Sequence, residues 1–160
     1  MTHGNNIEDT AGVSIRIEPA SRSDLAAILN LLTQSRLPHD GLSEHLTTAI
    51  VAREDQEVIG SAALELYGTA ALLRSVAVAP AWRGQGLGQR LTRAALELAR
   101  HHGVRDVYLL TETADSFFPK FGFSRIDRSQ VPAPVQTSNE FTSACPDSAP
   151  AMELRLKKYE

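Results

Sequence analysis

Residues 76–88 read Val-Ala-Val-Ala-Pro-Ala-Trp-Arg-Gly-Gln-Gly-Leu-Gly, and this stretch decides the fold of the chain. An apolar segment ends at Pro80, because proline cannot donate to the hydrogen-bond ladder of a sheet. Three glycines separated by single residues follow Arg83, and a helical pattern begins directly after them. Backbone N–H groups and the positive end of a helix therefore converge on one point, which suits a diphosphate.

The segment after the glycines has the pattern of an amphipathic helix. Leu87, Leu91 and Leu98 recur at helical spacing and predict one buried face, while arginines and a glutamate fill the opposite face. Gly103 is a typical C-terminal stop for such a helix. The order predicted here is strand, glycine-rich turn, helix.

Three known loops use glycines in this setting. A P-loop needs Lys followed by Ser or Thr after its last glycine, but Gln89 and Arg90 follow here. The Rossmann spacing G-x-G-x-x-G is also not met. What remains is Arg-x-x-Gly-x-Gly, formed by Arg83, Gly86 and Gly88, which resembles the acyl-CoA-binding motif of the GNAT superfamily of N-acetyltransferases. The alternative is a glycine turn with a structural task alone.

A second motif agrees with this resemblance. Residues 114–123, Ala-Asp-Ser-Phe-Phe-Pro-Lys-Phe-Gly-Phe, are similar to a later family segment in which a short helix ends in Gly-Phe. The similarity covers roughly residues 14–157. It implies an α/β (α+β) fold with a mixed, mostly antiparallel central sheet flanked by helices, and a splayed strand pair at the acyl-CoA site. We expect a flexible N-terminal tail at residues 1–13 and a single acetyltransferase domain at 14–160.

The composition is that of one soluble globular domain. The chain has 160 residues, of which 42% are hydrophobic and 22% charged, and these are ordinary proportions. Its net charge of −3 disfavours a nucleic-acid partner. No apolar run approaches the ~20 residues needed to cross a bilayer, so no membrane partner is expected.

Cysteine, histidine and the N-terminus point to a cytoplasmic protein without a metal. A single cysteine, Cys145, excludes an internal disulfide, and no basic segment followed by an apolar one marks a secretory signal. The five histidines and the cysteine form no short-spaced ligand cluster, so no metal site is predicted.

Hydrophobic periodicity and breakers place the remaining elements. Strands are predicted at residues 15–18, 50–53, 58–67, 70–79, 107–110 and 152–156, and helices at 25–32, 42–46, 87–102 and 134–140, with a short helix ending at Gly122.

The resemblance assigns the binding of acetyl-CoA, the expected co-substrate, to the end of the strand and the glycine turn. The strand would bind pantetheine through its main chain and the turn would hold the diphosphate through its amides; the residues are Val76, Ala77 and Val78, then Arg83, Gly84, Gln85, Gly86, Leu87 and Gly88. A primary amine would then attack the thioester directly, with a backbone N–H stabilising the oxyanion.

The residue that protonates the departing thiolate is not obvious. Many family members use a tyrosine at the position that is Phe118 here, which places Phe118 at the thioester but gives it nothing to donate. A thiolate with a pKa near ~8.5 is a tolerable leaving group unaided. Tyr67 and Tyr108 are the only credible phenols, and Tyr67, at a strand end, is the better candidate. The alternative is a packed aromatic at a turn.

Two acidic residues are candidates for the general base. Glu65 stands in an otherwise apolar strand, where a carboxylate costs free energy unless it is exposed or paired. Glu112 follows Thr111 at the end of a predicted strand, where sites of the family lie. For both, a solvent-facing position is the alternative. An α-amino group is about one-tenth neutral at pH 7, so a strong base is less needed for such an acceptor.

Arg74 interrupts an apolar strand beside the expected cleft and suits an anionic substrate. Ser75 and Thr111 complete the predicted substrate contacts. A salt bridge from Arg74 to Glu65 across adjacent strands is an equal alternative, and both contacts could occur in turn, before and after substrate binds.

Several segments are similar to one subgroup of the family, the small N-acetyltransferases of bacterial arsenic-resistance operons. They are 67–68, 72–78, 109–114, 117–118 and 141–146. This similarity implies detoxification of a small amine-bearing acceptor such as an arsenical amino acid. The alternatives are acetylation of a peptide or protein amine, and an acetyl-CoA-binding sensor without turnover. Many relatives are dimers, so a homodimer is possible.

Overall fold

The computed structural model describes residues 7–8, 14–111, 116–144 and 149–157. Its strands are β1 Ile7–Glu8, β2 Ser14–Pro19, β3 Ala49–Glu54, β4 Glu57–Tyr67, β5 Ala70–Val78, β6 Asp106–Leu110, β7 Ser124–Ile126 and β8 Ala151–Arg155. Its α-helices are α1 Leu25–Gln34, α2 Leu87–His101 and α3 Ala133–Gln136. Single turns and short 3-10 or π segments are η1 Arg22–Asp24, η2 Leu42–Thr48, η3 Pro80–Trp82, η4 Phe118–Phe121, η5 Arg128–Gln130 and η6 Glu140–Ala144.

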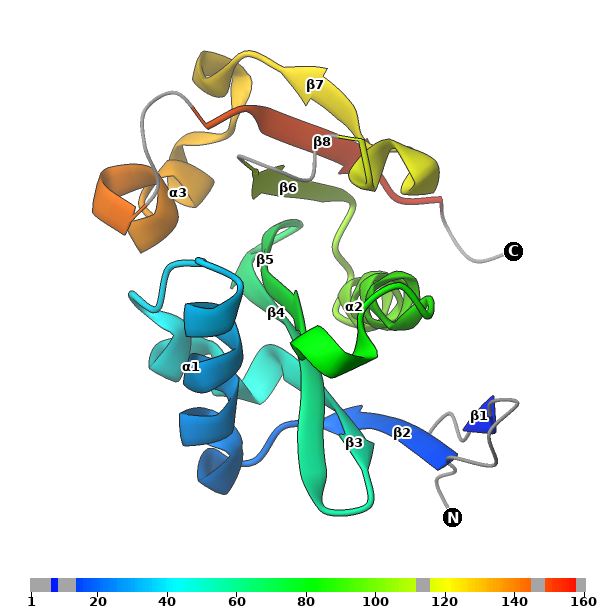
Figure 1. The fold of residues 1–160 in the computed structure, drawn as a ribbon. Coiled ribbons are helices and arrows are strands. Elements are labelled where there is room, and N and C mark those ends of the chain that lie inside the picture. The colour runs from blue at the N-terminus through cyan, green and yellow to red at the C-terminus, as the bar shows by residue number, and fades with distance from the viewer. Residues whose placement is uncertain (1–6, 9–13, 112–115, 145–148, 158–160) are drawn as a thin grey trace.

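The strands form one mixed sheet in the order β1-β2-β3-β4-β5-β6-β8-β7. Every neighbouring pair is antiparallel except β5 and β6, which are parallel because α2 connects them. Figure 1 shows β6, β8 and β7 gathered at one end of the molecule and β2 to β5 at the other. This architecture confirms the predicted fold class, a mostly antiparallel sheet flanked by helices.

The parallel pair separates soon after it forms. Residues 70–72 of β5 pair with residues 106–108 of β6, and β6 then continues beside β8 alone. Within the described residues, the rest of β5 has a strand neighbour only on the β4 side. The backbone of residues 73–78 is therefore open on one side, as the predicted splayed pair requires.

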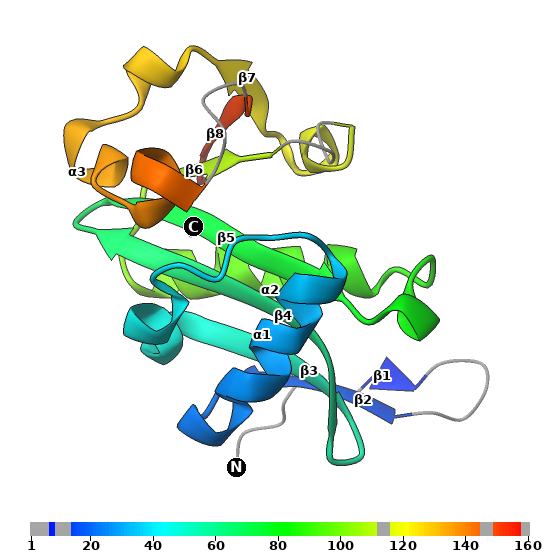
Figure 2. The same cartoon turned by 60° about the vertical axis from the view of Figure 1, so that its left-hand side comes forward.

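The two long helices cover opposite faces of β4 and β5, as both views show (Figures 1 and 2). Successive side chains of a strand point to opposite faces, so Leu64 packs in the core under α2 and Ala63 in the core under α1. On α2, Leu87 and Leu91 are fully buried and Leu98 is partly buried against the same core, which confirms the predicted apolar face. The two helices therefore hold β5 in place from opposite faces of the sheet.

The ends of the chain differ most from the sequence prediction. Residues 7–8 of the expected tail pair with β2 as β1, and the rest of that tail lies outside the described residues. The helix expected at 134–140 is split into α3 and η6. β7 was not assigned, because its three residues are too few to show a period. Among the described residues, no helix combines the length and apolar character needed to cross a bilayer.

Candidate functional site

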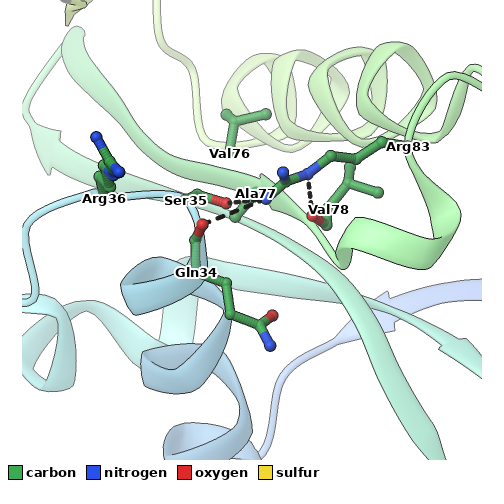
Figure 3. Close-up of a pocket in the computed structure, with 7 residues that line it drawn as sticks. All are labelled: Gln34, Ser35, Arg36, Val76, Ala77, Val78 and Arg83. Atoms are coloured by element: carbon green, nitrogen blue, oxygen red, sulfur yellow. Dashed lines mark hydrogen bonds between the residues drawn. The ribbon is translucent and has the colours of Figure 1, made fainter.

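A groove of about 390 Å³ runs along the open half of β5 (Figure 3). Two distant segments line it, the end of α1 with the residues after it and the end of β5 with the turn that follows. The lining residues are Gln34, Ser35, Arg36, Val76, Ala77, Val78 and Arg83. The groove therefore contains the strand residues predicted to bind pantetheine and the first residue of the glycine motif.

The glycine turn continues from the groove to the first turn of α2. Gly84 and Gly86 have φ of +80° and +84°, a conformation that residues with a Cβ rarely adopt, and Gly86 is the N-cap of α2. The first amides of the helix have no intrahelical acceptor, so they are available to an anion. The Leu87 side chain is only 2% exposed in the core, which leaves its backbone as the part that faces this site.

Gly88, unlike Gly84 and Gly86, has no positive φ and has room for a Cβ. A Cβ built there lies 3.6 Å from the ring of Phe117 and 3.8 Å from Val78, which is ordinary contact. The helix start thus packs closely against the end of β5 and against the aromatic segment after β6. Gln85, between the two left-handed glycines, is exposed.

Arg83 crosses the groove. Its Nε donates to the Val78 carbonyl at 3.1 Å, and its Nη2 lies 3.3 Å from Ser35 Oγ and 3.4 Å from the Gln34 carbonyl. The guanidinium thus joins the end of β5 to the C-terminal end of α1 (Figure 3). It occupies a main-chain acceptor of β5 that a ligand lying in the groove would otherwise meet.

A β-bulge in β5 directly precedes Val76, at the end of the groove opposite Arg83. Ser61 pairs with Ala77 and Ala63 pairs with Arg74, so β5 has one more residue than β4 over this interval. Ser75 has φ of +61°, which costs a non-glycine residue on the order of 1 kcal/mol. The buried Ser61 hydroxyl donates to the Ser75 carbonyl at 2.8 Å and holds the bulge. The sequence predicts a strand at residues 70–79 and gives no sign of this bulge.

A buried ion cluster lies next to the bulge on the α1 side of β4 and β5. We use this name for Glu65, Arg74 and Glu140, with Tyr67 and His45 at the edge. The side chain of Arg74 is 0% exposed and that of Glu65 is 1% exposed. His45 Nε2 lies 3.8 Å from Glu65 Oε1, and 24% of the His45 side chain is exposed.

Every guanidinium nitrogen of Arg74 has an acceptor. Nη1 lies 2.8 Å from Glu65 Oε2 and 2.7 Å from the Asp40 carbonyl. Nη2 lies 3.2 Å from the Pro38 carbonyl, and Nε lies 3.4 Å from Glu140 Oε2. The salt bridge predicted as the alternative for Arg74 is thus present. A substrate anion that binds this guanidinium would have to displace one of these carboxylate or carbonyl acceptors.

The cluster shifts the proton affinities of its members. Burial by itself raises the pKa of Glu65, yet hydrogen bonds from Tyr67 and Arg74 outweigh burial. A hydrogen bond from Ser138 and the charge of His45 act in the same direction, so the pKa of Glu65 lies below its ordinary value. Burial, with the hydrogen bond to Glu65, raises the pKa of Tyr67 to about 12. Both shifts stabilise a carboxylate and a protonated phenol at neutral pH.

The other predicted site residues lie at more varied positions. Phe118 is 7% exposed and packs edge-on against Phe123, with ring centroids 5.7 Å apart. Thr111, at the end of β6, is 8% exposed and its N–H donates to the Pro150 carbonyl at 3.0 Å. Glu112 and Cys145 lie outside the described residues. The predicted places of Phe118 at the thioester, Thr111 in substrate contact and Glu112 as general base stay predictions.

Three residues near the site were not assigned to it from the sequence. Arg36 follows α1 in a segment interpreted only as a break, and His45 was considered only as a metal ligand. Glu140 lies 66 positions after Arg74, and no spacing rule joins the two. Among the described residues, no group of three or more His, Cys, Asp or Glu side chains could hold a metal ion.

Comparison with known proteins assigns the fold to a family. The model of the Acetyltransferase (GNAT) domain matches residues 45–125, just over half of the chain. The chain belongs to the GNAT acetyltransferase family. The matched range contains β3 to β5, the glycine turn, α2 and η4. The predicted N-acetyltransferase class is thereby confirmed.

Individual relatives show how far the similarity extends. An uncharacterized N-acetyltransferase of Chlorobaculum tepidum, CT2212, is 28% identical over 120 residues, which cover 74% of this chain and 75% of that protein. The amino-acid acetyltransferase of Mycobacterium tuberculosis is 35% identical over 80 residues, which cover 49% of this chain and 45% of that enzyme. The match thus spans less than half the length of the M. tuberculosis enzyme.

A solved structure agrees over nearly the whole domain. The M. tuberculosis protein Rv2747, in complex with CoA and NLQ, has a TM-score of 0.74 at 26% identity, covering 88% of this chain and 99% of that one. These comparisons do not confirm the arsenic-resistance subgroup.

Proposed function

We propose that this GNAT chain transfers the acetyl group of acetyl-CoA to the primary amine of a small, anionic, amino-acid-like acceptor. The observation that carries the proposal is the continuous path from the glycine turn along the groove to the bulge of β5. A diphosphate and an extended arm with polar groups fit such a path, because it offers amides at one end and an open strand edge beside it.

The lining of the groove supports acetyl-CoA as the co-substrate. The amides at Gly86, Leu87 and Gly88 are free of intrahelical acceptors, and Arg83 adds a cation beside them. Because Arg83 holds the Val78 carbonyl, the main chain at Val76 and Ala77 would bind the amides of pantetheine in the manner of an added strand. The solved relative Rv2747 contains CoA, which agrees with this use of the groove.

The bulge supports direct attack by the amine. It turns the strand at Ser75, so Val76 has no partner in the ladder with β4, and Val76 and Ala77 line the groove. A backbone N–H in this position would stabilise the oxyanion of the tetrahedral intermediate, which forms when the amine nitrogen bonds to the thioester carbon. The C–S bond then breaks, the thiolate leaves, and the ammonium proton passes to solvent or to a base.

The ion cluster is better suited to positioning than to proton transfer. A carboxylate whose pKa is lowered accepts a proton poorly, and a phenol whose pKa is raised to about 12 donates one poorly. We therefore assign Glu65 and Tyr67 to holding Arg74 and the bulge. Glu112 is the remaining candidate for the base, and an amine acceptor that is partly neutral at pH 7 needs little help.

The acceptor class follows from the relatives and the charge near the groove. One relative is named as an amino-acid acetyltransferase. Arginines at the groove suit a carboxylate or another oxyanion on the acceptor. An arsenical amino acid, the acceptor implied by the resemblance to the arsenic-resistance subgroup, is also a small anionic amine. It is therefore one specific candidate for the acceptor.

The test is release of free thiol from acetyl-CoA by the purified protein in the presence of single amines. The amines are ordinary amino acids, arsenical and phosphinic amino acids, polyamines, aminoglycosides and short peptides. Release with anionic amino acids supports the proposal, and preference for a peptide or a polyamine contradicts the acceptor class. Binding of acetyl-CoA with no release for any amine contradicts turnover and favours a sensor.

A further inference from the structure

Arg36 stands where a helix normally ends in glycine. The Arg36 N–H donates to the Thr33 carbonyl at 3.2 Å, and the Leu37 N–H donates to the Leu32 carbonyl at 2.8 Å. This pair of bonds closes α1 in a Schellman motif, with Arg36 at the left-handed position and φ of +56°. The conformation disfavours any residue with a Cβ, and nothing in the motif itself requires an arginine.

Arg36 lines the groove, and its guanidinium has no partner among the described residues. It is exposed, and among the described residues no ion pair or side-chain hydrogen bond involves it. Arg83, by contrast, has three acceptors, and Arg74 has four that are carboxylates or carbonyls. Arg36 is thus the arginine of this region that keeps its guanidinium available.

Its place along the groove separates it from the diphosphate end. Figure 3 shows Arg83 and Arg36 at opposite ends of the row formed by Val76, Ala77 and Val78. Arg83 stands at the end that leads into the glycine turn. Arg36 therefore lies toward the bulge, where the amine attacks in the proposed function.

We propose that Arg36 binds the carboxylate of the acceptor and thereby makes the enzyme selective for anionic amines. This inference rests on the proposed function and adds to it the recognition residue. In an α-amino acid one carbon separates the amine from the carboxylate, so both groups must be held close to the thioester carbon. The planar fork of a guanidinium matches a carboxylate with two parallel hydrogen bonds.

An arginine at position 36 could also serve only to stabilise the end of α1. A cation at a helix C-terminus is stabilised by the helix dipole, whether or not a ligand is present. That reason predicts an effect of Arg36 on stability alone. Recognition of an acceptor predicts an effect on the KM of one class of acceptor, so kinetics distinguish the two.

The experiment compares wild type with Arg36→Gln, using the best amino acid of the amine panel and its α-carboxamide. We expect the KM for the amino acid to rise roughly 10- to 100-fold, because a charge-assisted pair is lost. The KM values for the carboxamide and for acetyl-CoA should stay within about twofold. Arg105→Gln is the matched control, since Arg105 is also exposed but follows the far end of α2. It should change none of the three.

Two results overturn the inference: an equal rise for the carboxamide and the amino acid, or a rise for acetyl-CoA alone. A binding measurement decides the inference even if no amine is acetylated, in which case the proposed function fails separately. N-acetylglycine and N-acetylglycinamide are titrated into the CoA-saturated protein. Preference for the carboxylate that disappears in Arg36→Gln supports recognition, and equal binding of the two probes contradicts it.

Discussion

The groove and the buried ion cluster are adjacent on the same strand, yet they treat polar groups in opposite ways. Around Arg74 every guanidinium nitrogen has an acceptor and the side chain is fully buried. Along residues 76–78 β5 has no strand neighbour on the β6 side, and the neighbouring Arg36 has no partner among the described residues. A satisfied buried network makes a region rigid, while open groups give a region affinity for ligands. The cluster thus fixes the strand that the groove exposes.

The strongest test of this difference removes Arg74. Arg74→Met keeps a side chain of similar length but leaves Glu65 and Glu140 buried without their cation. Loss of one partner from a buried pair costs about 3–5 kcal/mol, so we expect the free energy of unfolding to fall by that amount. Denaturation in urea, followed by circular dichroism, measures the change.

The control for that prediction is a pair of the same type that is partly exposed, although Arg100 Nε also donates to the Lys157 carbonyl. Arg100 Nη1 lies 2.6 Å from Glu97 Oε1, with 25% and 58% of the two side chains exposed. Arg100→Met should cost no more than about 1 kcal/mol. Equal costs for the two variants would mean that the cluster is no more important to the fold than a surface pair, and the comparison would fail.

The next largest effect is expected in the groove. Gly86→Ala places a Cβ at φ +84° with no heavy atom within 4 Å, so it strains the turn without a clash. Any shift that relieves the strain moves the amides at the start of α2, and we expect the Kd for CoA to rise at least ~10-fold, as when a charge-assisted contact is lost. Calorimetric titration with CoA measures it.

Gly103 is the matched position for this variant. It has φ of +76°, also with open space, at the other end of α2. Gly103→Ala should carry the same strain, about 1 kcal/mol of stability, and leave the Kd for CoA unchanged. Loss of CoA binding in both variants would trace the effect to helix stability and would remove the glycine turn from the binding site.

A smaller effect depends on pH. The pKa of Glu65 in the folded state lies below its ordinary value of 4.5. A lowered pKa means that the folded state binds this proton less tightly than the unfolded state. The stabilisation is therefore fully present above about pH 4.5 and is lost as the pH falls through the folded pKa.

Comparison with Glu65→Gln isolates this contribution. Between about pH 5 and pH 3, the free energy of unfolding should fall less steeply in the variant than in wild type, because glutamine has no proton to bind. Urea denaturation across this range gives both slopes. Parallel slopes would show that Glu65 is not a paired carboxylate in the folded protein.

The sequence predicts the features of the groove that depend on neighbouring residues, and it predicts less well those that depend on contacts between distant strands. The glycine turn and α2 follow from rules that act within a few residues, namely proline at the strand end, left-handed glycines and helical spacing. The pairing of Arg74 with Glu65 was predictable as one of two alternatives, since hairpin strands bring such residues together. No local sequence pattern predicts the bulge at Ser75, because the surrounding strands impose the left-handed backbone conformation of this serine.

The distant members of the site were beyond sequence reasoning for a related reason. Glu140 reaches Arg74 only because α3 and η6 fold back over β5, and this placement depends on packing rather than on a pattern. The sequence does not single out Arg36, because the break at residues 36–41 accounts for the end of α1 without it. What distinguishes Arg36 is the φ of +56° and the groove beside it, and both are properties of the fold.

The smallest predicted effect is a gain in stability at Arg36. Arg36→Gly removes the Cβ from a left-handed position, and we expect the free energy of unfolding to rise by about 0.5–1 kcal/mol. Arg36→Gln keeps the Cβ and should give no such gain, although both variants lose the guanidinium. Urea denaturation of the two variants separates backbone strain from charge. If glycine destabilises the protein instead, the charge at the end of α1 contributes more than the strain costs, and stability alone explains the arginine. If glycine stabilises the protein and also raises the KM for the anionic acceptor, Arg36 lowers the stability of the fold but contributes to binding of the acceptor in the groove.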